Sequence, residues 1–498
     1  TIGGRERKGS DVKINNTQLA QQVNDWFLSC VYGQYEEDAG KLGKMDIGKF
    51  IRVLNSYTAL NLLGVNFVAG TANVILGETL ERIETIAREY VNPTNSLKAD
   101  KWYTSHLRGT LSDIGALSPK HISTKLYEWL GVVDDYGVAD MDRKTKFGQL
   151  MHLDTLFFTS HIGEHLMQNR FALAMLDSMR AYDKNGKDIG SILDMVQTDS
   201  KGQVTFKPEM DLEKSKWTDG TKGTRNYQLE FKMKTRGILS RMHGEYSKLG
   251  RVAIERMAVG RMAYMFRKFV VPGFRRRWGR EQYIERLGQY VEGNYITTGK
   301  FLGNVGGHIF GKTEENSEYS FLQRLMSNLQ SFKMSLMSEE WASLDDHERA
   351  NIVRTISEVG FLVVAIIMAN IAMNMREGSD DPDEERFWSF IAYQAYRLQN
   401  ELLFFTPKLD SAMSILRSPA ASISVVENII KLSGQIFHPM AVYESGSWKG
   451  RPKIFKTLMN MTPIERQFYR LRDITDQVTF VQTAAFGGAG GSMGQPIQ

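Results

Sequence analysis

The run VGFLVVAIIMANIAMNM, residues 359–375, is the strongest apolar stretch of the chain and decides the expected fold. As a helix its seventeen residues would span about 25 Å, at ~1.5 Å per residue, short of the ~30 Å hydrocarbon core of a bilayer. Asn370 and Asn374 would each need a polar partner inside lipid. Acidic residues flank the run on both sides, so no positive charge orients it across a membrane. We therefore expect a buried helix of a bundle, with a segment that can enter a membrane as the alternative.

The stretch that follows the acidic turn, residues 386–405, supplies a partner for this run. Its apolar residues recur at intervals of four, seven and four, which places them on one face of a helix. They are Phe387, Ile391, Leu398 and Leu402. The acidic turn is long enough for the two helices to run antiparallel. We expect a helical hairpin in which this face packs against the apolar run, including Phe361, Leu362, Ile366 and Ile367.

Composition extends this helical prediction to the whole chain of 498 residues. Proline is scarce, at 11 residues, while Met (24) and Phe (26) are frequent, which favours long helices over a β-sandwich. Cys30 is the only cysteine, so the chain has no intramolecular disulfide, and we expect it to fold in a reducing cytoplasm. The net charge of +5 is too small to predict nucleic-acid binding by the chain as a whole.

The predicted fold is mainly α, a modular multi-helix bundle with one small β-hairpin insertion. Turn signals such as Asp183-Lys184-Asn185-Gly186, beside short strand-like runs such as Val204-Thr205-Phe206, mark the insertion. The sequence begins at Thr1, which we interpret as the start of a piece of a larger protein. The expected regions are a linker (1–16), an N-terminal helical region (17–180), the β insertion (181–227), a basic helical region with a Gly-rich loop at 297–318 (228–318), the hairpin region (319–405), a short-helix region (406–486) and a flexible tail (487–498).

Residues 236–286 form a basic segment, with thirteen Lys and Arg against four Glu. Clustered guanidinium groups bind phosphate oxygens in a fork, and the aromatic residues among them can stack on bases or lie at a lipid interface. The candidate phosphate- or partner-binding residues are Arg267, Lys268, Arg275, Arg276, Arg277 and Arg280. The possible partners are DNA and an acidic protein, and a solvated helix face without a partner is the third interpretation.

The motif His161-Ile-Gly-Glu164-His165 matches the H-x-x-E-H order of the inverted zinc proteases, in which two histidines bind zinc and the glutamate polarises water. A zinc hydrolase also needs a third protein ligand, and no later segment stands out as its source. Gly163 weakens the helix that would hold the ligands. We therefore favour a polar helix face, and metal analysis of the purified chain would separate the two. We find no phosphate-binding, dinucleotide-binding, nucleophile-elbow or calcium-loop motif, and we expect no cofactor.

Several short patterns resemble a known group of proteins. They are Phe405-Thr406-Pro407, ILRSPA at 415–420, VENII at 426–430, Pro439 with Tyr443, Lys449-Gly450, LGVN at 63–66, NVILG at 73–77 and the basic stretch 275–280. Together they are similar to the C-terminal regions of the very large virion proteins of crAss-like phages, short-tailed viruses of gut Bacteroidales. The resemblance covers about half of the chain in patches. It implies a large protein carried inside the particle and delivered with the genome.

From the resemblance we expect a virion cargo or ejection protein, stored in the capsid or tail interior and delivered to the host cell, and not an enzyme. Its expected partners are other virion proteins of the tail or portal lumen, phage DNA, and the host membrane after ejection. A static tail or portal-adjacent component is the second hypothesis, and the zinc hydrolase is the third.

Overall fold

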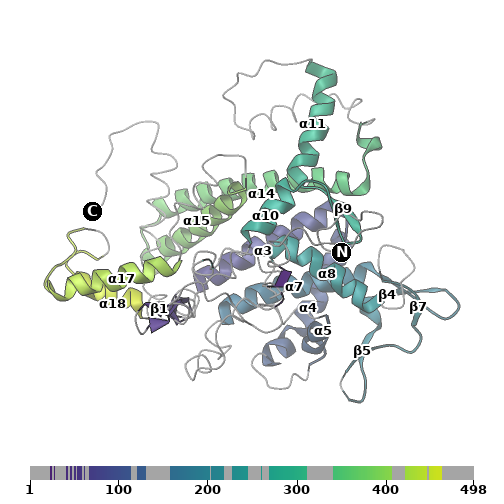
Figure 1. Cartoon of the computed structure of the whole chain (residues 1–498), viewed down its shortest axis with the longest axis horizontal. Helices are drawn as coiled ribbons and strands as arrows, with labels where there is room; N and C mark the ends of the chain where they lie inside the picture. The colour runs from purple at the N-terminus through teal and green to yellow at the C-terminus, as the bar shows by residue number, and fades with distance from the viewer. Residues whose placement is uncertain are drawn as a thin grey trace, which may run out of the picture.

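The described part of the chain is mainly helical, which confirms the predicted fold class (Figure 1). The computed structural model describes residues 67–113, 121–130, 158–217 without 202, 227–244, 269–310, 340–405 and 421–462 without 446 and 447, with residue 260 and scattered residues between 23 and 61. Two of these scattered pairs form the short ladder of β1 (Lys41–Leu42) and β2 (Met45–Asp46). The expected linker 1–16 and flexible tail 487–498 lie outside the described residues.

Four helices of the N-terminal half form the main core. They are α3 (Phe67–Ala87), α4 (Pro93–Asp113), α5 (Ile122–Leu130) and α7 (Phe158–Ser178). Helix α7 packs against both α3 and α4, and its segment from Phe171 to Leu176 is fully buried. Ile83 of α3 and Leu126 of α5 belong to the same hydrophobic cluster. Helix α4 begins at Pro93, where the missing N–H of proline costs no helical hydrogen bond.

The predicted β insertion follows α7 and consists of short antiparallel pairs. Its elements are β3 (Arg180–Tyr182), β4 (Asp188–Ser191), the 3-10 turn η3 (Ile192–Met195), β5 (Val196–Thr198), β6 (Val204–Phe206) and β7 (Asp211–Lys216). Strand β3 lies between β4 and β7, and β5 pairs with β6. The buried Trp217 stacks edge-on against Phe206 and Phe231. These contacts attach the insertion to the helical core.

The middle of the chain departs from the sequence-based prediction in two ways. It contains α8 (Tyr227–His243), α10 (Val270–Trp278), β8 (Gln282–Ile284), β9 (Gln289–Val291) and α11 (Asn294–Phe310). The β8–β9 hairpin, like the β1–β2 ladder, is a β element outside the predicted insertion. Residues 297–310 were expected to be part of a Gly-rich loop, but they are helical. The buried side chains of Tyr295, Thr298 and Phe301 explain this, because packing on one face of α11 outweighs the weak helix propensity of its glycines.

Helices α14 (Asp346–Glu377) and α15 (Pro382–Leu403) form the predicted hairpin and contact each other along their length (Figure 1). Asp345 caps α14 by accepting a hydrogen bond from the backbone N–H of Glu348, whose side chain accepts in return from the N–H of Asp345. Asp381 caps α15, and Pro382 occupies its first turn. At the left end of the molecule in Figure 1, α17 (Ala421–Ile436) and α18 (Lys453–Met461) pair in a separate lobe.

Candidate functional site

The structure divides the predicted basic cluster into two exposed and two buried arginines. Arg275 and Arg280 are exposed, whereas the side chains of Arg276 and Arg277 are only 3–4% exposed. Arg276 and Arg277 were candidate phosphate- or partner-binding residues, but both are buried and do not present their guanidinium groups to a partner. The reason is helical geometry, since consecutive residues of α10 point to different sides and two of them face the interior. Arg267 and Lys268 lie outside the described residues.

Arg276 and Arg277 belong to a buried ion network that joins α3, α10 and α14. Arg277 donates from Nε to Glu358 Oε2 at 3.0 Å, and its guanidinium lies 4.3 Å from the centre of the Phe405 ring. Arg276 Nη2 lies 3.4 Å from Glu84 Oε1 and 3.5 Å from Glu358 Oε1. Neither distance comes with a hydrogen bond, so Arg276 balances charge without good bonding geometry.

Arg354 of α14 completes the network from the other side. Its Nη2 lies 2.7 Å from Glu84 Oε2 and 2.5 Å from Glu89 Oε2, and Nη1 donates to Asn351 Oδ1 at 2.9 Å. Burial opposes ionisation of Glu84 and Glu89, but the charge of Arg354 outweighs it and holds the pKa of both carboxyl groups below the ordinary value. Arg276, Arg277 and Arg354 therefore face the carboxyl groups of Glu84, Glu89 and Glu358, of which Glu84 and Glu89 have the lowered pKa.

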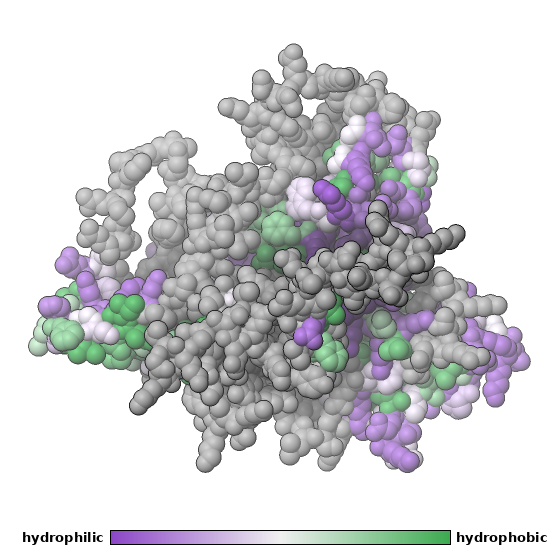
Figure 2. Space-filling model, in the orientation of Figure 1, coloured by the Kyte–Doolittle hydropathy of each residue, from purple (hydrophilic) through white to green (hydrophobic). Residues whose placement is uncertain are grey.

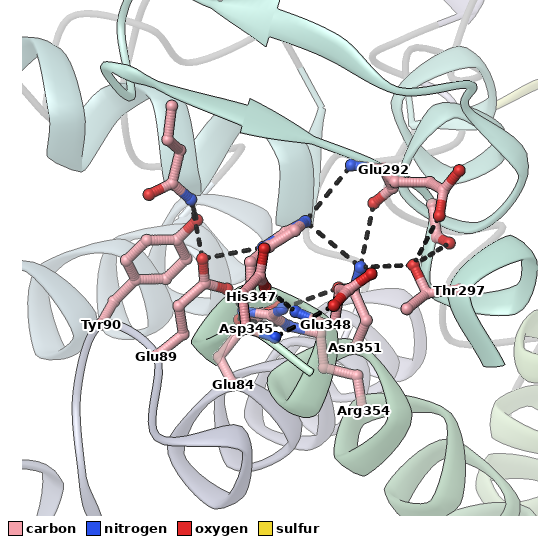
Figure 3. Close-up of polar contacts among 12 residues, drawn as sticks. Glu84, Glu89, Tyr90, Glu292, Thr297, Asp345, His347, Glu348, Asn351 and Arg354 are labelled. Carbon is pink, nitrogen blue, oxygen red and sulfur yellow. Dashed lines mark hydrogen bonds and ion pairs between the residues drawn. The ribbon is translucent and has the colours of Figure 1, made fainter. Parts of the chain in front are cut away.

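His347 extends the network toward the β8–β9 hairpin (Figure 3). Its Nδ1 lies 2.9 Å from Glu89 Oε1, and its Nε2 accepts from the backbone N–H of Glu292 at 3.3 Å. The side-chain amide of Asn351 also lies 3.2 Å from Nε2. A backbone N–H can only donate, so the partners assign a neutral imidazole with its proton on Nδ1. The network is then charge-balanced.

This arrangement is suited to fixing the packing of helices and not to proton transfer. Guanidinium groups keep their protons at every physiological pH, and the carboxylates with lowered pKa stay ionised. Buried ion pairs add little net stability, but the loss of one partner is strongly destabilising. The network therefore specifies how α3, α10 and α14 dock. Sequence reasoning missed Glu84, Arg354 and Glu358. Arg354 and Glu358 directly precede the apolar run and could have drawn attention, whereas Glu84 lies among other charged residues and gives no local signal.

A second ion network lies on the turns of α3 that precede Glu84. Arg170 of α7 forms ion pairs with Glu78 and Asp100, and Arg82 pairs with the same two acids. Glu81 is fully buried beside them, and burial raises its pKa to about 7. Its carboxyl is therefore neutral over most of the acidic range. The two arginines and their two acidic partners surround it.

The predicted zinc ligands lie on α7, which continues as a helix through Gly163. The side chains of His161, Glu164 and His165 lie outside the described residues. Among the side chains that the structure describes, no group of three or more His, Cys, Asp or Glu could hold a metal ion. The choice between a polar helix face, which the sequence favours, and a zinc site therefore stays a prediction.

The hairpin is held together by small residues more than by the large ones expected from the sequence. Its contact is centred on alanines with Met373 and Tyr396, and Trp388, Ile391 and Tyr393 pack at its edge. The alanines are Ala369, Ala372, Ala392 and Ala395. Of the expected residues, Leu362 and Leu402 are buried, and Phe361 packs against the main core. Ile366 and Leu398 are half-buried.

Phe387 and Ile367 are the exceptions, with 56% and 51% exposed, so the expected packing of these two was wrong. Alanines let the two helix backbones approach closely. Large side chains at the margin of such a close contact turn outward. The spacing of these alanines was the signal that could have predicted the contact face.

As a result, α14 carries an exposed apolar face. Seven large apolar residues lie on it, most of them three or four positions from another member, and they are between 40% and 53% exposed. They are Ile356, Val363, Val364, Ile367, Met368, Ile371 and Met375. Among the described helices, α14 alone is long and apolar enough to cross a membrane, and 33% of its most apolar window is buried.

No protein-family model, no curated protein and no solved structure matches the chain. The fold, the two ion networks and the exposed apolar face are the features of the chain that bear on its function.

Proposed function

We propose that this chain is part of a phage virion protein that is packaged in the capsid or tail and delivered with the genome. The exposed apolar face of α14 is the observation that carries the proposal. It extends from Ile356 to Met375, about 29 Å at ~1.5 Å per residue, which is close to the ~30 Å hydrocarbon thickness of a bilayer. Asn370 and Asn374 are exposed on the same part of the helix. A mainly apolar face of this kind marks a surface that a partner or a membrane covers.

Two features support delivery over a purely static role. The hairpin contact is centred on four alanines, each of which buries little apolar area, while Met373, Tyr396 and the side chains at its edge supply the larger contacts. The buried ion network instead fixes the other end of α14, at Arg354 and Glu358, to α3 and α10. One half of α14 is thus anchored, and the other half can exchange its partner. Within the particle we assign the face to other virion proteins of the tail or portal lumen, and after release to the host membrane.

The static component remains the competing function, because a permanent neighbour could cover the same face. Mass-spectrometric inventories of purified virions and of particles that have released their genome distinguish the two. We expect peptides from this chain in intact virions, their loss from emptied particles, and their recovery in the membrane fraction of infected cells. Peptides kept at unchanged copy number in emptied particles would support the static component, and their absence from intact virions would refute both.

A matched pair of variants links the result to the α14 face. Val364→Ser with Ile367→Ser makes the face polar without touching the buried side of the helix. Phe387→Ser changes an equally exposed apolar residue on α15. We expect the first variant to lose recovery in the membrane fraction and the second to keep it. Equal recovery of both variants would show that the α14 face does not mediate association with the membrane.

A further inference from the structure

The lobe formed by residues 421–462, which we call the C-terminal lobe, carries a second apolar surface far along the chain from α14. Large apolar residues are exposed along both of its helices and at the turn between them. They are Ile429, Ile430, Ile436, Phe437, Met440, Val442, Phe455 and Leu458. Figure 2 shows hydrophobic residues gathered at the left end of the molecule, where α17 and α18 lie.

The most exposed of these residues form the end of the lobe. Phe437 is 81% exposed and Met440 is 89% exposed, and Ile436 precedes them at the end of α17. We call these three residues the apolar tip. The turn is ordered, because the N–H of Phe437 donates to Gly434 O and the N–H of Ala441 donates to His438 O. The tip is therefore held outward by backbone hydrogen bonds.

Basic residues lie close to the tip on one side. Within 421–462 the lobe has five basic residues, Lys431, Lys449, Arg451, Lys453 and Lys456, against the acidic Glu427 and Glu444. The backbone brings several of them next to the tip, since the N–H of Lys453 donates to Ala441 O at 2.7 Å and the N–H of Tyr443 donates to Arg451 O at 3.0 Å.

Aromatic rings hold some of these cations in place. The Lys456 ammonium lies 5.2 Å from the Trp448 ring centre and 5.3 Å from that of Tyr443. Arg451 lies 5.5 Å from the Trp448 ring centre. The Trp448 side chain is 2% exposed, so the surrounding packing holds its ring in one position. The positive charge near the tip is thus built into the fold of the lobe.

We propose that the C-terminal lobe binds the surface of an anionic membrane, with the apolar tip in the boundary between headgroups and acyl chains and the lysines on the phosphates. Apolar side chains that enter the interface together with adjacent basic residues are the combination that such surfaces select. The α17–α18 pair is too short to span a bilayer, at 16 and 9 residues, so the lobe lies on the membrane and does not cross it. This inference does not depend on the proposed function, because the surface belongs to the lobe and not to α14.

Co-sedimentation of the full chain with vesicles tests the proposal. We expect binding to vesicles of equal parts phosphatidylcholine and phosphatidylglycerol, and much weaker binding to phosphatidylcholine alone. Phe437→Ser with Met440→Ser is expected to lower the partition coefficient by about tenfold or more, because both side chains lose their transfer into the interface. Lys449→Gln with Lys453→Gln is expected to lower it by roughly fivefold per lysine and to weaken its salt dependence.

Tyr283→Ser with Tyr290→Ser is the matched control, because these two rings are 56% and 64% exposed on the β8–β9 hairpin. We expect this control to bind as the unchanged chain does. Far-UV circular dichroism checks that every variant keeps its helix content.

Several results would overturn the proposal. One is equal binding to both vesicle types, and another is no binding to either. A third is loss of binding in Val364→Ser with Ile367→Ser but not in the tip variant, which would assign membrane binding to α14. A fourth is concentration-dependent dimerisation that the tip variant abolishes, which would make a second copy of this chain the occupant of the surface.

Discussion

Replacement of Arg354 by methionine tests whether the buried network fixes the docking of the central helices. Arg354 is 3% exposed and is the common partner of Glu84 and Glu89. Methionine keeps most of the aliphatic volume but leaves both carboxylates without their nearest cation. Removing one partner of a buried ion pair costs about 3–5 kcal/mol of unfolding free energy. Each kcal/mol lowers Tm by about 2–4 °C in a domain of 150–250 residues, so we expect a fall of about 6–20 °C.

Thermal unfolding followed by far-UV circular dichroism at neutral pH measures this change. Arg386→Met is the matched control, since Arg386 is 63% exposed and pairs with an exposed Asp383 three residues away. Exposed pairs contribute about 0–1 kcal/mol, so the control should lower Tm by no more than a few degrees. A fall in Tm for Arg354→Met as small as that of the control would refute the structural role of the network.

The dependence of the unfolding free energy on pH below neutrality gives a second test of Arg354→Met. Glu84 and Glu89 have a pKa below the ordinary value of about 4.3 in the folded chain. Their contribution is present above the unfolded pKa and is lost as pH falls toward the folded one. Arg354→Met removes the main cause of the lowered pKa. The loss of unfolding free energy between neutral pH and pH 3 should therefore be smaller in the variant than in the unchanged chain. An equal loss in both proteins would contradict the assigned ion pairs.

Two further predictions concern charged side chains outside this network. Because burial raises the pKa of Glu81 to about 7, the folded chain binds a proton there that the unfolded chain releases above about pH 4.5. At about 1.4 kcal/mol per pKa unit, Glu81→Gln should raise the free energy of urea unfolding by about 3 kcal/mol at pH 8 and by almost nothing at pH 4; an equal effect at both pH values would argue against the raised pKa. Arg275→Ala with Arg280→Ala should leave Tm unchanged and lower the affinity for duplex DNA, with a salt slope reduced by about two, whereas Arg277→Ala should lower Tm. Unchanged DNA affinity and salt slope in the double variant would make the two exposed arginines plain surface.

Patterns that depend on neighbouring positions along the chain were predictable. The helical hairpin followed from apolar spacing on both sides of the acidic turn, but its second helix begins at Pro382 and not at Arg386 as expected, because Asp381 caps it. The β insertion followed from its turn residues, and Gly186 does adopt the positive φ of 79° that such a turn requires. Both signals act over a few residues, so the local sequence carries them.

The burial of the arginines in the basic stretch 275–280 could not be predicted from the local sequence. Four arginines within six positions look alike in the sequence, but Arg276 and Arg277 are buried and Arg275 and Arg280 are not. The burial of Arg276 and Arg277 depends on Glu84 and Glu358, which lie far away in the chain. Burial of an arginine is favourable only where a distant carboxylate meets it, and no local pattern contains that information.

The sequence by itself determined that this protein is a mainly helical chain with an apolar hairpin and a small β insertion, because helix and turn formation depend on residue spacing within one or two turns. Only the tertiary structure decided which side of the hairpin is covered. The alanines bring α14 and α15 close together, and that close approach turns Ile367 and Phe387 outward. The tertiary structure alone also placed Lys453 beside Ala441 and Lys449 beside Tyr443 in the C-terminal lobe, because those neighbours are set by the pairing of backbone segments and not by the order of residues.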